Sequence, residues 1–93
     1  MDDEPFTPAE ARRVISAILE TGAVVLGRHV REDAMPNRSI TAVDINNVLR
    51  AGTVDPAESE KGEWRYHVRT QRFVIVVAFR SETELRVVTA WRT

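Results

Sequence analysis

Apolar residues recur at helical spacing early in the chain, between two helix-end signals. Thr7 is a favourable N-cap, Pro8 suits the first helical position, and Glu10 lies three residues after the cap, as in a capping box. Gly22 is a typical C-terminal stop. We therefore predict a helix over residues 8–21, with an apolar face made of Ala11, Val14, Ile15, Ile18 and Leu19.

A second helix is predicted to begin after Ile40. Thr41 with Asp44 three residues later resembles a capping box, and Gly52 ends the pattern. Its buried stripe is Ile45, Val48 and Leu49.

The segment between these helices is less regular. It begins with a short apolar stretch, Val24–Leu26, and a brief helical turn is predicted over residues 28–34. Pro36 should break that turn, because proline disfavours helix in the residue before it.

Strand patterns fill the last third of the chain. Trp64, Tyr66, Val68 and Thr70 alternate with Arg65, His67 and Arg69, as in a half-buried strand. The continuous apolar run 73–79 predicts a central strand that is covered on both faces. A third alternation places Leu85, Val87, Thr89 and Trp91 on one side, so we expect Trp64 and Trp91 to pack in the core. Residues 53–63 read as a poor strand start followed by an exposed acidic loop.

These elements predict one α+β domain over residues 1–93. Short connections should join the three strands into an antiparallel meander, with the N-terminal helices packed on one face of the sheet. Residues 1–6 are expected to form a flexible acidic lead.

Composition narrows the class of protein. Of the 93 residues, 43% are hydrophobic and 29% are charged, which favours a globular fold over general disorder. No cysteine is present, so a disulfide and a cysteine nucleophile are excluded. The apolar runs are too short for a membrane span, and the acidic start is unlike a signal peptide. We expect a cytoplasmic protein without a membrane partner.

The near-neutral net charge of −1 conceals a basic C-terminal third. Residues 64–93 contain six arginines and two glutamates. Arginine matches phosphate with a planar fork, so this clustering is compatible with RNA binding. A GC-rich genome, which favours arginine codons, is the alternative explanation for the preference for arginine over lysine.

Several short motifs within residues 27–92 resemble a widespread bacterial family of unknown function. That family is commonly grouped with the RelE-like and BrnT-like toxins, the metal-independent ribonucleases of toxin–antitoxin pairs. The motifs are His29-x-x-x-x-x-Met35, Arg38 before Ile40-Thr41, Val48-Leu49-x-x-Gly52, Trp64-Arg65-Tyr66, and a closing strand Val88-Thr89-Ala90-Trp91. The resemblance implies a RelE-like fold, RNA as substrate and an antitoxin protein as partner.

The resemblance also implies a catalytic set, namely His29, Arg38, Tyr66 and Thr89. Metal-free cleavage needs a base for the ribose 2′-hydroxyl, an acid for the leaving oxygen and cations for the transition state. His29 suits acid–base chemistry near neutral pH, and a helical turn would put Asp33 beside it. Arg38 could bind phosphate with two hydrogen bonds, and Tyr66 and Thr89 could contact RNA.

Each candidate also has a structural interpretation. His29 could pack or cap a helix, Arg38 could be a solvated loop residue, and Tyr66 and Thr89 suit strands by propensity. His67 could replace His29 in the chemistry. A basic RNA-binding set is expected at Arg28, Arg31, Arg65, His67 and Arg69, although the last three could simply form the solvated side of a sheet.

Three functions therefore remain open. One is a toxin endoribonuclease, which the resemblance implies needs no metal or cofactor, and the sequence shows no metal-ligand spacing. The second is a non-catalytic module of the same fold that binds RNA or protein, and the third is a structural domain that only forms oligomers through its sheet edge. A homo-oligomer is compatible with each of them.

Overall fold

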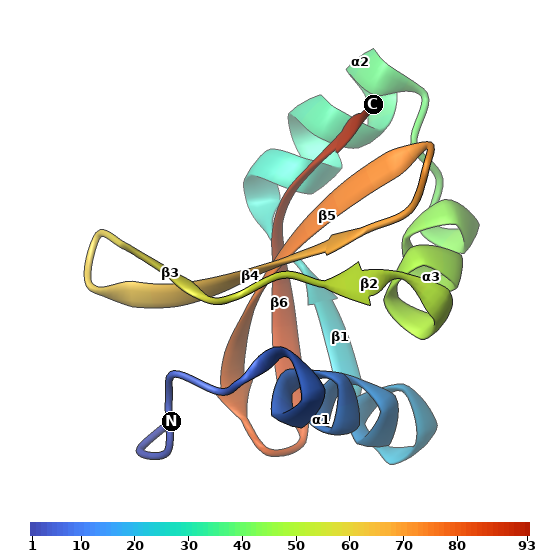
Figure 1. Ribbon diagram of the computed structural model, residues 1–93. Coiled ribbons are helices and arrows are strands. Elements are labelled where there is room, and N and C mark those ends of the chain that lie inside the picture. Colours follow the sequence, from blue (N-terminus) through green and yellow to red (C-terminus); the bar gives the residue numbers. More distant parts are fainter.

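A computed structural model describes residues 1–93 and has an α+β fold, in which helices lie beside a six-stranded mixed sheet (Figure 1). None of the helices has the length and apolar character that crossing a bilayer requires. The elements in chain order are α1 (Pro8–Thr21), β1 (Ala23–Leu26), the π-helical segment η1 (Val30–Ala34), α2 (Met35–Arg38), α3 (Ala42–Ala51), β2 (Thr53–Val54), β3 (Glu58–Glu60), β4 (Glu63–Arg69), β5 (Phe73–Ser81) and β6 (Glu84–Arg92).

Both predicted helix starts are confirmed as capping boxes. At α1, Thr7 Oγ1 accepts a hydrogen bond from the Glu10 N–H at 3.2 Å, and the Glu10 carboxylate accepts one from the Thr7 N–H at 2.9 Å. At α3, Thr41 and Asp44 exchange the same two bonds. These bonds satisfy N–H groups that have no partner within the helix, so the local sequence fixes where each helix begins.

The sheet has the strand order β1-β6-β5-β4-β2, with β3 also paired to β4. The antiparallel meander of β4, β5 and β6 is confirmed. The sheet as a whole is mixed, because the apolar stretch after α1 forms β1 and pairs in parallel with β6. Gly22 allows this approach, since a Cβ there would lie 2.3 Å from the Thr83 carbonyl oxygen.

The segment predicted as an acidic loop is largely paired. β2 (Thr53–Val54) and β3 (Glu58–Glu60) pair antiparallel with two different parts of the same edge of β4. A tight turn at Lys61 and Gly62 joins β3 to β4, and both residues have positive φ, as a type I′ hairpin turn requires.

The helices pack on one face of the sheet, as predicted. All buried helix residues belong to a single core cluster, together with alternate residues of β5. The β5 members are Phe73, Ile75, Val77 and Phe79, whereas Val74, Val76 and Ala78 are buried on the opposite face.

The expected break at Pro36 is corrected, because the helical segment continues to Arg38. Proline has no N–H, but the residue before it does, and Met35 donates to the Val30 carbonyl across a wider π-type turn. Pro36 lies at the first turn of α2, where a missing N–H costs little. The segment ends at Ser39, which adopts a left-handed conformation with φ 53°.

Residues 4–6, part of the lead that is expected to be flexible, contact the core. The Phe6 N–H donates to the Tyr66 hydroxyl at 2.9 Å, and that hydroxyl donates to Glu4 at 2.9 Å. The Phe6 ring lies against the rings of Tyr66 and Phe79. Residues 4–6 therefore cover one end of the core.

Arg12 links the two long helices. From α1 its guanidinium donates to the carbonyls of Leu49, Arg50 and Gly52 at the end of α3, and burial lowers the pKa of Arg12. A cation at this position satisfies carbonyls that the helix leaves unpaired and complements its negative end.

We predict that Arg12→Ala lowers the free energy of unfolding by about 1–2 kcal/mol, because the α3 carbonyls lose a charged donor. Arg13→Ala, at an exposed position of the same helix, is the matched control and should change it by less than about 0.5 kcal/mol. Urea unfolding of both variants measures the difference. A loss in Arg12→Ala no larger than the control's would contradict this role.

Tyr66 provides a second test, because it is the only tyrosine in the chain. Burial raises the pKa of the Tyr66 hydroxyl from 10.0 to about 12. In unfolded chains the Tyr66 hydroxyl ionises near its ordinary pKa, so below that pH its ionisation should not affect the free energy of unfolding. Between about pH 10 and pH 12 the unfolded chain ionises while the folded one does not, so the free energy of unfolding should fall as the pH rises.

A pH titration followed by the ultraviolet absorbance of tyrosinate should report this single ionisation, in the native protein and in denaturant. The pH at the midpoint of the titration is expected to be well above 10 in the native protein and close to the ordinary tyrosine pKa in denaturant. Coincident midpoints would show that the Tyr66 hydroxyl is not buried and bonded as described.

Candidate nucleic-acid interface

One face of the sheet carries no helix, and we call it the open face. The strand register builds it from three cross-strand rows. The first contains Arg86 and Ala78, the second Thr89, Val76 and His67, and the third Trp91, Val74 and Arg69. Arg65 joins the first row, because it alternates with the core residue Tyr66 along β4.

A β-bulge in β6 determines which side chains reach this face. Val77 pairs with Val87 and Val76 pairs with Thr89, so Val88 is an extra residue in β6. Residues 89 and 91 consequently point away from Leu85 and Val87. The prediction that Trp91 packs in the core is therefore wrong, whereas Trp64 does pack against the core.

The bulge brings Trp91 against His67. Their ring centroids are 5.7 Å apart with an interplanar angle of 70°, an edge-to-face arrangement. Both side chains are half-buried. Together they form an aromatic pair in the open face, above the buried Val74 and Val76.

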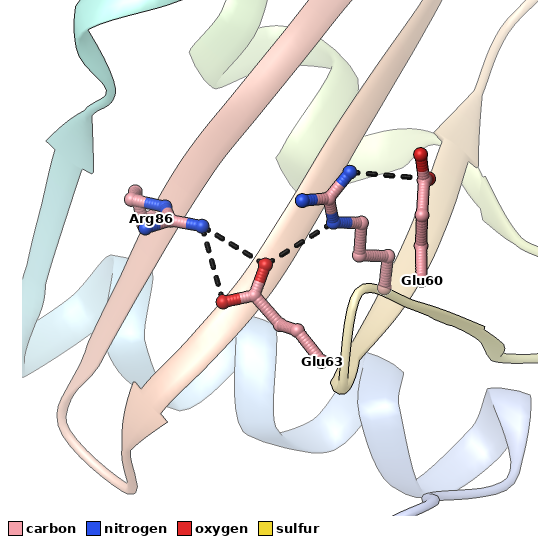
Figure 2. A network of polar contacts seen from close by, with 4 residues as sticks. Glu60, Glu63 and Arg86 are labelled. Atoms are coloured by element: carbon pink, nitrogen blue, oxygen red, sulfur yellow. Dashed lines mark hydrogen bonds and ion pairs between the residues drawn. The ribbon is translucent and has the colours of Figure 1, made fainter.

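Carboxylates neutralise the arginines around this pair. The Glu63 carboxylate lies between two arginines and contacts Arg86 at 2.9 Å and Arg65 at 3.1 Å (Figure 2). Arg65 also contacts Glu60 at 3.1 Å, and Arg69 contacts Asp55 at 2.6 Å. The basic stripe predicted from Arg65, His67 and Arg69 thus shares one face, but its three carboxylate neighbours balance Arg65, Arg69 and Arg86.

A small cleft of about 240 Å³ adjoins the open face beside β6. Gly27, Arg28, His29, Arg86 and Val88 line it. The predicted pairing of His29 with Asp33 is present, with a Nε2–Oδ2 distance of 3.6 Å, and Arg28 contacts Glu32 at 3.0 Å. The cleft therefore combines an imidazole with two guanidinium groups at the surface.

The structure does not bring the four proposed catalytic residues together. Tyr66 is fully buried on the core face and its hydroxyl is occupied, so it is not positioned to stack on a base. Thr89 lies on the opposite face of the sheet. No hydrogen bond or ion pair joins His29 to Arg38.

Arg38 instead supports the edge of β6. Its Nη1 donates to the Ala90 carbonyl at 2.6 Å, beyond the point where β1 ends. Arg92 reciprocates by donating to the carbonyls of Arg38 and Ser39. Arg31 has a similar contact, since its Nε donates to the Leu26 carbonyl at 3.0 Å.

The sequence pattern alone does not predict this cleft. It indicates Arg28 and His29 as candidates but not Arg86, because 57 positions separate Arg86 from His29 along the chain. No group of three or more histidine, cysteine or carboxylate side chains is arranged to hold a metal ion.

We predict that Arg38→Ala lowers the free energy of unfolding by about 1–2 kcal/mol, because the Ala90 carbonyl loses a charged donor. Arg28→Ala should cost less than about 0.5 kcal/mol, since its ion pair with Glu32 is exposed. Thermal or urea unfolding distinguishes them. Equal stability of the two variants would leave Arg38 without a structural role.

Comparisons of this chain with protein-family models, with curated proteins and with solved structures find no match. The architecture supports the general α+β class.

Proposed function

We propose that the open face binds single-stranded RNA without cutting it. The observation that supports this most is the His67–Trp91 pair, two half-buried rings on a face that no helix covers. Aromatic rings on an open sheet are platforms for unstacked bases, and each stacked base is worth about 1–3 kcal/mol. Thr89 lies in the same row as His67 and offers a hydroxyl to a phosphate or a ribose.

The ion pairs determine how such binding should behave. Arg65, Arg69 and Arg86 already contact carboxylates, so few cations are free to release counterions from RNA. Stacking should therefore supply most of the affinity, and the dependence on salt should be shallow. The net charge of −1 adds no long-range attraction.

The experiment measures the affinity of a short fluorescent single-stranded RNA at several salt concentrations. Trp91→Ala should weaken binding by about tenfold, as the loss of a stacking platform predicts. Arg50→Gln, an exposed arginine on α3, is the control for nonspecific charge and should bind like the wild type.

Glu63→Gln gives a test in the opposite direction. It releases Arg65 and Arg86 from one carboxylate, so RNA should bind more tightly and with a steeper salt dependence. Glu20→Gln makes the same change in net charge at an exposed residue of α1, away from the open face, and it should have little effect. Identical behaviour of the two variants, or unchanged binding in Trp91→Ala, would refute the proposal.

A metal-independent ribonuclease is the second candidate, and the cleft favours it. His29, whose Nε2 lies 3.6 Å from Asp33, lines the cleft with Arg28 and Arg86, where a phosphate could bind. In this function a ribose 2′-hydroxyl would lose its proton to a base and attack the adjacent phosphate. The bond to the 5′-oxygen of the next nucleotide would break as that oxygen takes up a proton, which leaves a 2′,3′-cyclic phosphate, and an antitoxin would cover the cleft. Cleavage of end-labelled RNA in EDTA that is lost in His29→Ala would favour the nuclease over the binding module.

A further inference from the structure

The free edge of β1 presents unpaired backbone groups. The Ala23 and Gly27 N–H groups donate to the Thr83 and Val87 carbonyls of β6. In a strand alternate residues bond in opposite directions, so Val24 and Leu26 direct their N–H and C=O groups outward. Arg31 donates a hydrogen bond to the Leu26 carbonyl. The N–H and C=O groups of Val24 and the N–H of Leu26 therefore remain without a hydrogen-bond partner.

An apolar groove runs beside this edge, with a volume of about 200 Å³. Five of its six lining residues are hydrophobic: Val24 and Leu26 from β1, and Ala42, Ile45 and Leu49 from α3, where Asn46 completes the lining. The chain's three exposed large hydrophobic residues belong to β1 and α3, with Val24, Val25 and Val43 exposed by 36%, 40% and 67%. An open strand edge with an apolar border is the arrangement that accepts an added strand.

Two features make this edge complementary to itself. Val24 is the only residue of β1 with both backbone groups free, so it can exchange two hydrogen bonds with the same residue of another copy across a twofold axis. The two ends of β1 also differ in charge. The exposed residues near Ala23 include Glu20 and Glu82, whereas the exposed Arg31, which contacts no carboxylate, follows Leu26. Antiparallel pairing would bring the acidic end of one copy to the basic end of the other.

We propose that this chain forms a twofold-symmetric dimer in which β1 pairs antiparallel with β1 of a second copy. The two sheets then become continuous, and Val24 of each copy is covered beside the α3 helices. This surface is separate from the aromatic pair and does not depend on RNA binding.

Sedimentation velocity over a range of protein concentrations tests the proposal on the full chain. The wild type should pass from monomer to dimer as concentration rises. Val24→Lys places two like charges at the centre of the seam and should raise the dimer Kd by more than about tenfold. Ser16→Lys adds the same charge at an exposed position of α1 and should leave the Kd unchanged.

Amide hydrogen exchange of the wild type keeps the test independent of how the variants fold. The Val24 and Leu26 amides should become protected as the dimer forms. A chain that stays monomeric, a dimer that Val24→Lys leaves intact, or amides whose exchange ignores concentration would overturn the proposal. A monomer whose β1 edge is instead protected by another protein would assign the edge to that partner.

Discussion

The extra residue Val88 in β6 determines what each face of the sheet presents. Before it, Leu85 and Val87 point to the core; after it, Thr89 and Trp91 point to the open face, and Ala90 turns inward. A bulge changes the side-chain alternation of the rest of its strand, because the period of a strand is two. The aromatic pair depends on this shift, since His67 would otherwise face no second ring. Gly27 lies against the residue that precedes the bulge, and only glycine allows this approach, because a Cβ there would lie 2.7 Å from the Val87 carbonyl oxygen.

Arginine has two different roles around this sheet. Arg12, Arg38 and Arg92 donate to backbone carbonyls at a helix end, a strand edge and a turn, so they replace hydrogen bonds that the secondary structure leaves open. Arg65, Arg69 and Arg86 lie on the open face with carboxylate partners. Counting arginines along the sequence therefore overstates the charge that is available to a phosphate. Our proposal of stacking-dominated RNA binding therefore rests on the arrangement of rings and ion pairs, and not on the number of arginines.

Local signals in the sequence were sufficient for the elements whose ends are fixed by neighbouring residues. Both capping boxes, the end of each long helix and the β4–β6 meander follow from side chains within a few positions. What the sequence could not provide depends on distant contacts. β1 becomes a strand because β6 is beside it, residues 4–6 contact Tyr66, and Trp91 changes face because of one unpaired residue. The expected catalytic residues also depend on distant contacts, because they come from separate segments that only the family resemblance grouped together. The structure does not bring them to one place, since Tyr66 and Thr89 lie on opposite faces of the sheet.

The two tryptophans allow the central claim to be tested in one spectrum, because Trp64 packs against the core and Trp91 lies on the open face. A heteronuclear NMR titration with short single-stranded RNA would follow both indole N–H resonances and the backbone amides. If the open face binds RNA, the Trp91 indole and the amides around His67 and Thr89 should shift together and saturate, while the Trp64 indole and the α1 amides stay in place. Shifts confined to residues 27–29, or spread over the helices with Trp91 unchanged, would contradict it.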